Sequence, residues 1–242
     1  MPAPPRLAWI EPGLPLPDPQ QALDEPNGLL AAGRDLGADR LLEAYQKGIF
    51  PWYTEGQPVL WWSPDPRMVL QPGRFKASRS LTKTVRALTR TGRWTLRLNS
   101  DFEAVIRACA APRRQGPGTW ISEDIVRAYG ALHRRGHAHS VEVWSDCGTL
   151  IGGLYGVSIG RMFYGESMFA RVTDASKLAL FALARLLQRL DFPMIDCQQS
   201  TRHLASLGAQ EVSREEFLRA IADLVVQTAP DWSTLSIEIP QA

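Results

Sequence analysis

The sequence predicts an α+β fold in which helices cover a mixed sheet. Segments 139–144, 149–158 and 161–169 are rich in β-branched and aromatic residues, and short turns at 146–148 and 159–160 join them. This spacing is typical of an antiparallel meander. The remaining elements expected after it are helices at 174–190, 201–207 and 213–227 and a short apolar strand at 192–198. Strands followed by a mixture of helix and strand favour an α+β layer.

The first quarter of the chain reads as extended rather than helical. Residues 1–27 hold eight prolines and little periodicity, which predicts an arm lying on the surface. Residues 38–47 place three apolar side chains on one helical face, and Gly48 suits the end of that helix. The aromatic stretch 49–67 contains four prolines, so we expect it to be extended or turning.

The most informative charge pattern lies between Arg67 and Arg97, which contains nine basic residues and no acidic one. Ser78 can cap a helix that begins at Arg79. With 100° per residue, one face of this helix carries a row of cations and the opposite face is apolar. The row consists of Arg79, Lys83, Arg86 and Arg90. A solvated face usually mixes both signs, so the row favours a nucleic-acid phosphate backbone over plain solvent exposure or a membrane surface.

The wider charge balance agrees with this. Residues 1–139 hold 19 Lys and Arg against 13 Asp and Glu, and residues 140–242 hold 8 against 12. A basic first part suggests a polyanionic partner, and an acidic second part suggests a cationic ligand. Between them, 101–111 and 122–135 read as amphipathic helices, and Trp120 lies in the loop that joins them.

Composition excludes several classes of protein. No run of 18 apolar residues is present, and the N-terminus lacks the basic and apolar regions of a secretory signal. The three cysteines are far apart and form no CxxC pair. We therefore expect a cytoplasmic protein with no membrane span, no disulfide and no zinc cluster.

A polar pair at the end of the last expected strand is the first candidate for chemistry. Because side chains alternate along a strand, Asp196 and Gln198 should share one face and Cys197 should point the other way. A neutral amide is no base at pH 7, so Gln198 is better suited to accept a hydrogen bond and position an amine. The alternative is that the pair caps a helix beginning near Thr201.

Cys197 offers a rival mechanism as a nucleophile with a histidine base. The candidate bases are His133, His137, His139 and His203. A lone cysteine is more often a small buried hydrophobe, however, and no acid or cysteine completes a metal site with these histidines.

Glu166 is the second candidate. It lies in an expected strand among aromatic and apolar residues, where a carboxylate is costly unless it is paired. It could bind a guanidinium or ammonium group of a substrate, or pair internally with Arg161 or Arg171.

Taken together, the segments resemble the leucyl/phenylalanyl-tRNA–protein transferase family over about residues 26–218. The motifs that carry the resemblance are GLLAAGRDL (28–36), AYQKGIFPWY (44–53), LWWSPDPR (60–67), GTWI (118–121), AHSVEVW (138–144), GGLYG (152–156), GESMF (165–169), ASK (175–177), IDCQ (195–198) and HLASLGA (203–209). Each motif alone is weak, but so many in one order are specific.

The resemblance implies a small N-terminal domain at 1–70 and a catalytic domain at 71–242 like that of the N-acetyltransferases. We expect a monomer without cofactor or metal, and the resemblance implies an aminoacyltransferase. Such an enzyme moves Leu or Phe, less readily Met, from aminoacyl-tRNA to proteins that begin with Arg or Lys, and the product is an N-end-rule degradation signal.

The resemblance also assigns roles to residues. Tyr45, Trp52 and Trp120 would hold the terminal adenosine and neighbouring parts of the charged tRNA end. The pocket for the aminoacyl side chain would be formed by Leu154, Phe163, Met168, Leu183 and Ile195. Glu166, Asp196 and Gln198 would serve the acceptor and the reaction centre, with Asp196 holding Gln198 and the amide carbonyl aligning the amine. Asp196, a water and the 2′-hydroxyl of the tRNA stay open as proton acceptors.

The chain departs from the family pattern at Arg34, Lys76 and Ala170, none of which touches IDCQ or GESMF. Two other functions compete with transfer from tRNA. An acetyl-CoA-dependent N-acetyltransferase would need a glycine-containing pyrophosphate loop, and residues 170–176 contain no glycine. A non-catalytic RNA-binding module would need neither the Asp196–Gln198 pair nor a closed apolar pocket.

Overall fold

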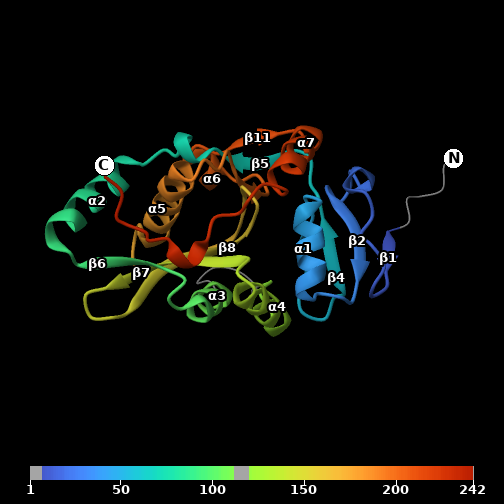
Figure 1. Ribbon diagram of the computed structural model, residues 1–242, viewed down its shortest axis with the longest axis horizontal. Helices are drawn as coiled ribbons and strands as arrows, with labels where there is room; N and C mark the ends of the chain where they lie inside the picture. Colours follow the sequence, from blue (N-terminus) through green and yellow to red (C-terminus); the bar gives the residue numbers. More distant parts are fainter. Residues whose placement is uncertain (1–6, 112–119, 242) are drawn as a thin grey trace.

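A computed structural model describes residues 7–111 and 120–241, and it contains two sheets (Figure 1). The first sheet lies at one end of the molecule and has the order β1-β2-β4-β3. Its strands are β1 (Ala8–Ile10), β2 (Leu29–Gly33), β3 (Phe50–Pro51) and β4 (Val59–Trp62). β1 runs parallel to β2, and the other pairs are antiparallel. The start of the expected arm (1–6) and the loop 112–119, including the first two residues of GTWI, lie outside the described residues.

The second sheet has the order β11-β5-β10-β9-β8-β7-β6 within the described residues. Its strands are β5 (Arg67–Leu70), β6 (Trp94–Leu98), β7 (Ala138–Ser145), β8 (Leu150–Ile159), β9 (Met162–Ala170), β10 (Ile195–Gln198) and β11 (Gln210–Val212). β7, β8 and β9 form the expected antiparallel meander. β10 runs parallel to β9 but antiparallel to β5, so the prediction of a mixed sheet in an α+β fold is confirmed.

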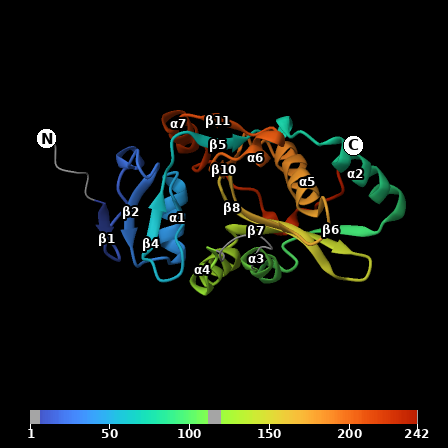
Figure 2. The ribbon, with the colours of Figure 1, turned by 180° about the vertical axis from the view of Figure 1, so that it is seen from behind.

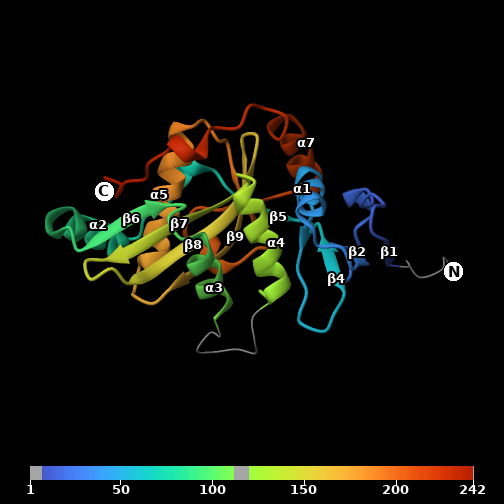
Figure 3. The same cartoon turned by 60° about the horizontal axis from the view of Figure 1, so that its bottom comes forward.

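Helices cover both faces of the second sheet (Figures 2 and 3). The helices are α1 (Ala38–Gln46), α2 (Arg79–Thr91), α3 (Phe102–Ala110), α4 (Glu123–Arg134), α5 (Ala175–Arg189), α6 (Arg202–Ser206) and α7 (Arg214–Leu224), with short 3₁₀ turns at Pro19–Gln21, Pro72–Arg74 and Trp232–Thr234. α5 packs on one face, whereas α3 and α4 pack on the other. Among the described residues, no helix is long and apolar enough to cross a bilayer.

Capping explains where the helices begin. The side chains of Ser78, Asp101, Ser122 and Ser213 each accept a hydrogen bond from a backbone N–H in the first turn of the following helix. This satisfies a donor that the helix itself leaves free. Gly48, after α1, has a φ of 72°, and a side chain there would meet α7 residues, with Leu218 Cδ2 only 2.6 Å away. Only glycine allows this turn and this close approach together.

The buried side chains form two clusters. One contains the first sheet, α1, α3, α4 and the face of the second sheet beneath them. The other contains α2, α5, the opposite face of the second sheet and the C-terminal segment with Trp232. Since Tyr45, Tyr129 and Tyr155 all belong to the first cluster, the N-terminal sheet and the second sheet share one continuous core.

Several elements differ from the sequence prediction. β6, β11 and β1 were not expected as strands. The strand expected at 192–198 begins only at Ile195, since Pro193 lacks a backbone donor. The helix expected at 213–227 ends at Leu224. The implied division between residues 70 and 71 falls directly after β5, a strand that is hydrogen-bonded in the second sheet.

The parallel pair β9 and β10 separates early. Only Ile195 with Phe163 and Asp196 with Tyr164 are in register. Beyond these pairs the two strands carry Glu166 and Gln198 on opposite sides of the split. The split therefore opens the sheet between the two buried clusters.

Candidate active site

A cavity of about 650 Å³ lies at this split. Its apolar lining includes Leu154, Phe163, Met168, Leu180, Leu183 and Ile195. The remaining wall carries Glu166, Gln198, Trp52 and Trp120. All five residues expected to shape an aminoacyl pocket therefore meet in one apolar wall, beside Glu166 and Gln198, two of the three polar residues expected at the reaction centre. The sequence did not indicate Leu180, which lies one helical turn before Leu183 on α5.

Gln198 owes its position to an irregularity at the end of β10. Pairing with β5 shifts register between Asp196 and Gln198, and Gln198 has a left-handed φ of 62°. The regular alternation expected for this strand is therefore wrong here. Cys197 and Gln198 both line the cavity, whereas Asp196 is fully buried and does not. The alternative of a helix-capping pair is also wrong, because the side chain of Thr201 caps α6.

Asp196 forms a buried ion pair with Arg67 of β5. Arg67 Nε donates to Asp196 Oδ1 at 2.8 Å and Nη2 donates to Oδ2 at 2.6 Å. The two side chains are 1% and 0% exposed. The guanidinium lies between the rings of Phe50 and Phe217, at 4.8 and 4.5 Å from their centroids. In the sequence Arg67 is only one of nine basic residues between positions 67 and 97, and no local pattern indicates this role.

Asp196 holds the backbone rather than the side chain of Gln198. The backbone N–H of Gln198 donates to Asp196 Oδ1 at 2.8 Å. The ion pair thus fixes the strained turn that presents Gln198 to the cavity. Both carboxylate oxygens of Asp196 are occupied by these contacts.

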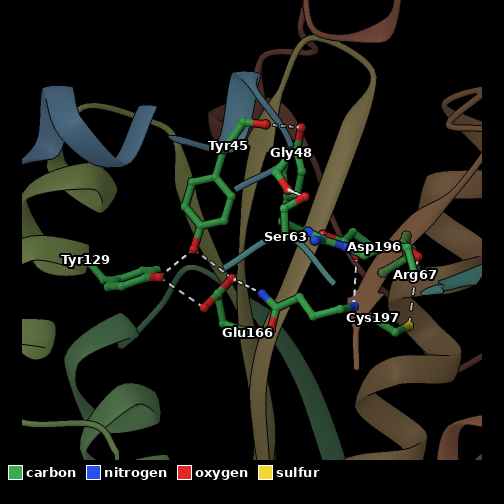
Figure 4. A network of polar contacts seen from close by, with 11 residues as sticks. Tyr45, Gly48, Ser63, Arg67, Tyr129, Glu166, Asp196 and Cys197 are labelled. Atoms are coloured by element: carbon green, nitrogen blue, oxygen red, sulfur yellow. Dashed lines mark hydrogen bonds and ion pairs between the residues drawn. The ribbon is translucent and has the colours of Figure 1, made fainter. Parts of the chain in front are cut away.

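The side chain of Gln198 is held by Glu166 across the split. Gln198 Nε2 donates to Glu166 Oε1 at 2.7 Å, and the Tyr45 hydroxyl donates to the same oxygen at 2.7 Å. The Tyr129 hydroxyl donates to Oε2 at 3.0 Å and also contacts the Tyr45 hydroxyl. Figure 4 shows Tyr45 and Tyr129 pointing toward Glu166, with Arg67 and Asp196 on the other side.

Neither internal partner expected for Glu166 is used. Arg161 donates to the carbonyl oxygen of Leu190, and Arg171 donates to that of Leu150. The cationic partners are replaced by neutral donors from α1 and α4. Tyr129 was not among the candidate residues, since nothing in the sequence of α4 separates it from an ordinary core tyrosine.

The neutral surroundings change the acidity of Glu166. Burial raises its pKa to about 7, and hydrogen bonds from Tyr45, Tyr129 and Gln198 oppose that rise. The neighbouring charge of Asp196 also raises it. Burial likewise raises the pKa of the Tyr45 and Tyr129 hydroxyls well above the usual range, so both stay donors.

The three aromatic residues assigned to the tRNA end do not play equivalent parts. Trp52, after β3, and Trp120, before α4, line the cavity, and Trp52 is 41% exposed. Tyr45 is fully buried and does not line the cavity. Its hydroxyl contacts Glu166, and its carbonyl accepts from the Tyr164 hydroxyl at 2.7 Å. Tyr45 therefore supports the site from behind.

The rival nucleophile Cys197 is poorly suited to ionise. Burial raises the pKa of its thiol, and the nearby Asp196 charge raises it further. Its thiol contacts the carbonyl of Ile195. Two of its candidate bases are engaged elsewhere: His133 contacts the carbonyl of Ala138, and His139 stacks on Trp232. His203 lines the cavity, and the described residues contain no group of three His, Cys, Asp or Glu that could hold a metal ion.

The basic row lies on α2 as the periodicity predicted. Leu81, Val85 and Leu88 are buried. Arg79, Lys83, Arg86 and Arg90 are exposed, and none of them forms an ion pair with a described residue. Ser80 and Thr84 on the same helix donate to Asp174, at the start of α5, at 3.0 and 3.1 Å. The basic helix is therefore anchored to the helix that supplies part of the apolar wall.

Comparison with known proteins agrees with this arrangement. A family model described as "Leucyl/phenylalanyl-tRNA protein transferase" matches residues 69–222, and one described as its N-terminal domain matches residues 34–65.

Similar curated proteins carry the same name. The leucyl/phenylalanyl-tRNA–protein transferase of Cupriavidus metallidurans is 59% identical over 217 residues, which cover 88% of this chain and 86% of that protein. The one of Paraburkholderia xenovorans is 54% identical over 240 residues, covering 96% and 98%. Among solved structures, "The structure of L-PGS from Bacillus licheniformis" aligns with a TM-score of 0.36 at 8% identity, over 72% of this chain and 54% of that one, a similarity too low to carry an argument. The chain belongs to the leucyl/phenylalanyl-tRNA–protein transferase family.

Proposed function

We propose that this protein transfers Leu or Phe, and less readily Met, from aminoacyl-tRNA to the α-amine of proteins that begin with Arg or Lys. The observation that carries the proposal is the joining of an apolar wall to the Gln198–Glu166 pair in one cavity. An apolar side chain esterified to a polar tRNA end needs both surfaces within a few ångströms. Family membership supports the same reaction.

The reaction needs positioning more than activation. The amine nitrogen attacks the carbonyl carbon of the aminoacyl ester, the C–O bond to the tRNA ribose breaks, and the amine loses a proton. The ester is already activated, so the step needs neither ATP nor a covalent enzyme intermediate. An α-amine has a pKa near 7.7–8.0, so roughly a tenth or more is neutral at pH 7. Effective concentration in the cavity can then supply ~7–11 kcal/mol of the barrier.

Gln198 is the residue that aligns the amine. Its Nε2 is committed to Glu166, which leaves Oε1 free to accept a hydrogen bond from the amine. Asp196 fixes the backbone of Gln198 but lies outside the cavity, with both oxygens occupied. We therefore place Asp196 as a positioning residue and Gln198 as the group that contacts the acceptor. The proton leaves to a water or to the departing ribose oxygen.

The cavity accounts for a loose choice among apolar side chains. An apolar wall discriminates mainly by size, at about 1–3 kcal/mol per methylene. Leu154, Phe163 and Met168 offer no buried polar group that would select one apolar side chain by hydrogen bonding. Trp52 and Trp120 offer flat surfaces for the terminal adenosine.

The exposed row on α2 would bind tRNA phosphates. If all four cations contact phosphates, the slope of log K against log salt concentration is about −3, at roughly −0.7 to −0.9 per contact. The proposal also includes a catalytic fold like that of the N-acetyltransferases, a cytoplasmic location and a product that acts as an N-end-rule degradation signal. A donor pool of charged tRNA is cytoplasmic, which supports that location.

A direct transfer assay tests the function. Purified protein is mixed with radiolabelled Leu-tRNA and a model protein that begins with Arg, and label is counted in the base-stable protein fraction. We expect transfer that disappears when the acceptor begins with Ala and drops at least about a hundredfold in Gln198→Ala, in line with the loss of an aligned donor or acceptor in other enzymes. Silence with Leu-, Phe- and Met-tRNA alike would refute the proposal.

A further inference from the structure

Tyr129 occupies an unusual place beside the cavity. It is fully buried on α4, yet its hydroxyl reaches Glu166 Oε2 at 3.0 Å and contacts the Tyr45 hydroxyl. The ring of Tyr129 packs edge-on against the ring of Tyr155, with 5.6 Å between the ring centroids, and this contact fixes the orientation of Tyr129. Tyr129 does not line the cavity, so it reaches the chemistry only through Glu166.

The state of Glu166 decides which atom Gln198 presents. An ionised carboxyl can only accept, so it takes the amide Nε2 of Gln198 and leaves Oε1 toward the cavity. A protonated carboxyl has a hydrogen to donate and can bind Oε1 instead. The amide would then turn its NH₂ group toward an amine that also donates, and the alignment would be lost.

We propose that Tyr129 is a positioning residue for the reaction. Its hydroxyl keeps Glu166 a hydrogen-bond acceptor, and Glu166 in turn holds the amide oxygen of Gln198 toward the attacking amine. This rests on the proposed function, because it needs Gln198 to align an amine. Beyond the proposed function, the inference gives a role to Tyr129 on α4 and fixes which end of the Gln198 amide faces the amine.

The groups around Glu166 leave its ionisation finely balanced. Tyr45 on α1 and Tyr129 on α4 donate to it, while Asp196 on β10 and Tyr155 on β8 are electrostatic neighbours. Cys109 on α3 lines the same cavity. No Lys or Arg in the described part of the chain forms an ion pair with Glu166. Among the described residues, the hydrogen bonds that favour the ionised form of Glu166 therefore come from neutral donors, the two tyrosines and the Gln198 amide.

The test is the pH dependence of transfer by Tyr129→Phe, measured as kcat from pH 6 to 8.5 with both substrates saturating. Removing the Tyr129 hydrogen bond to ionised Glu166 should shift the acidic limb of the plot of kcat against pH toward higher pH, by about one pH unit. Transfer at pH 6.5 should fall about five- to tenfold, and at pH 8.5 it should come within about twofold of the wild type. The acceptor amine titrates identically in every variant, so it cancels in the comparison.

Tyr53→Phe is the matched control. It also removes the hydroxyl of a buried tyrosine, but that hydroxyl bonds Ser122 rather than Glu166. Its profile should coincide with that of the wild type. A uniform loss in Tyr129→Phe at every pH, or an equal shift in Tyr53→Phe, would mean that Tyr129 supports only packing and would overturn the proposal.

Glu166→Gln gives an independent readout, since an amide cannot titrate. We expect its profile to lack the limb that belongs to Glu166, and Tyr129→Phe added to it should change transfer less than twofold at any pH. A wild-type limb retained in Glu166→Gln contradicts the proposal even if Tyr129→Phe fails to fold. Failure of the function itself is distinct, because then the wild type transfers nothing.

Discussion

Two carboxyl groups hold Gln198, and they are compensated in opposite ways. Asp196 is paired with a guanidinium at 2.6 and 2.8 Å, behind the strand and out of contact with the cavity. Glu166 lies on the cavity wall, and its hydrogen-bond donors among the described residues are neutral, two tyrosines and one amide. The first is paired with a cation, whereas the second has a pKa raised by burial to about 7.

The difference separates scaffold from chemistry. A buried ion pair with two hydrogen bonds between its partners has a fixed geometry, which suits the backbone turn at Gln198. A carboxyl among neutral donors can gain or lose a proton near neutral pH, which suits a group that orients a reacting side chain. Three changes test this contrast, in order of decreasing effect.

Arg67→Met should have the largest effect, because it leaves the buried Asp196 carboxylate without its cation. We expect the free energy of unfolding, measured in urea at pH 7.5, to fall by about 3–5 kcal/mol. Adding Asp196→Asn removes the orphaned charge and keeps an acceptor for the Gln198 N–H, so it should recover much of that loss. A loss under about 1 kcal/mol in the single variant would show that the pair does not fix the scaffold.

Glu166→Gln should have an intermediate effect that depends on pH. The folded-state pKa of about 7 lies above the ordinary value of 4.5, so between these values the folded protein binds more protons than the unfolded chain. The free energy of unfolding contributed by this group is therefore complete below pH 4.5 and is lost as pH rises through 7. The wild type should lose roughly 1–3 kcal/mol between pH 4.5 and 8 that Glu166→Gln keeps. Parallel curves in urea unfolding at several pH values would argue against a titrating Glu166.

Arg219→Ala should have the smallest effect and sets the scale for exposed charge. Arg219 Nη2 lies 2.7 Å from Glu215 Oε1 on α7, and both side chains are 73% exposed. Water and salt screen such a pair, so we expect about 0.5 kcal/mol or less, with no difference left in 1 M salt. A cost comparable to that of Arg67→Met would mean that burial does not separate the ion pairs of this protein.

Local patterns predicted most of the elements but not their edges. The meander and α2 with its cap at Ser78 follow from periodicity and capping residues, and the order of strands and helices predicted a mixed sheet. β5, β6 and β11 were not predicted; β6 and β11 are edge strands, each with one partner and a weaker pattern of burial, whereas β5 is an interior strand. Seven of the residues that the motifs singled out line one cavity: Leu154, Phe163, Met168, Leu183, Ile195, Glu166 and Gln198.

The roles within the site were harder to predict than its location. Alternation placed Cys197 away from the cavity, and a bulge at the strand end reversed that. Arg67 is 129 positions from Asp196, and Tyr129 is 37 from Glu166. A spacing rule reaches only along one element, so it cannot pair side chains at such separations.

The sequence by itself determined most of the helices, the meander, the place of the cations on α2 and the residues that can line an apolar wall, because these depend on neighbours a few positions apart. Tertiary structure alone decided that β9 and β10 part after Tyr164 and Asp196, which opens the cavity. It alone gave Asp196 a cation and Glu166 two tyrosines. The energy of a buried carboxyl depends on the groups that surround it in space, and only the folded chain brings those groups together.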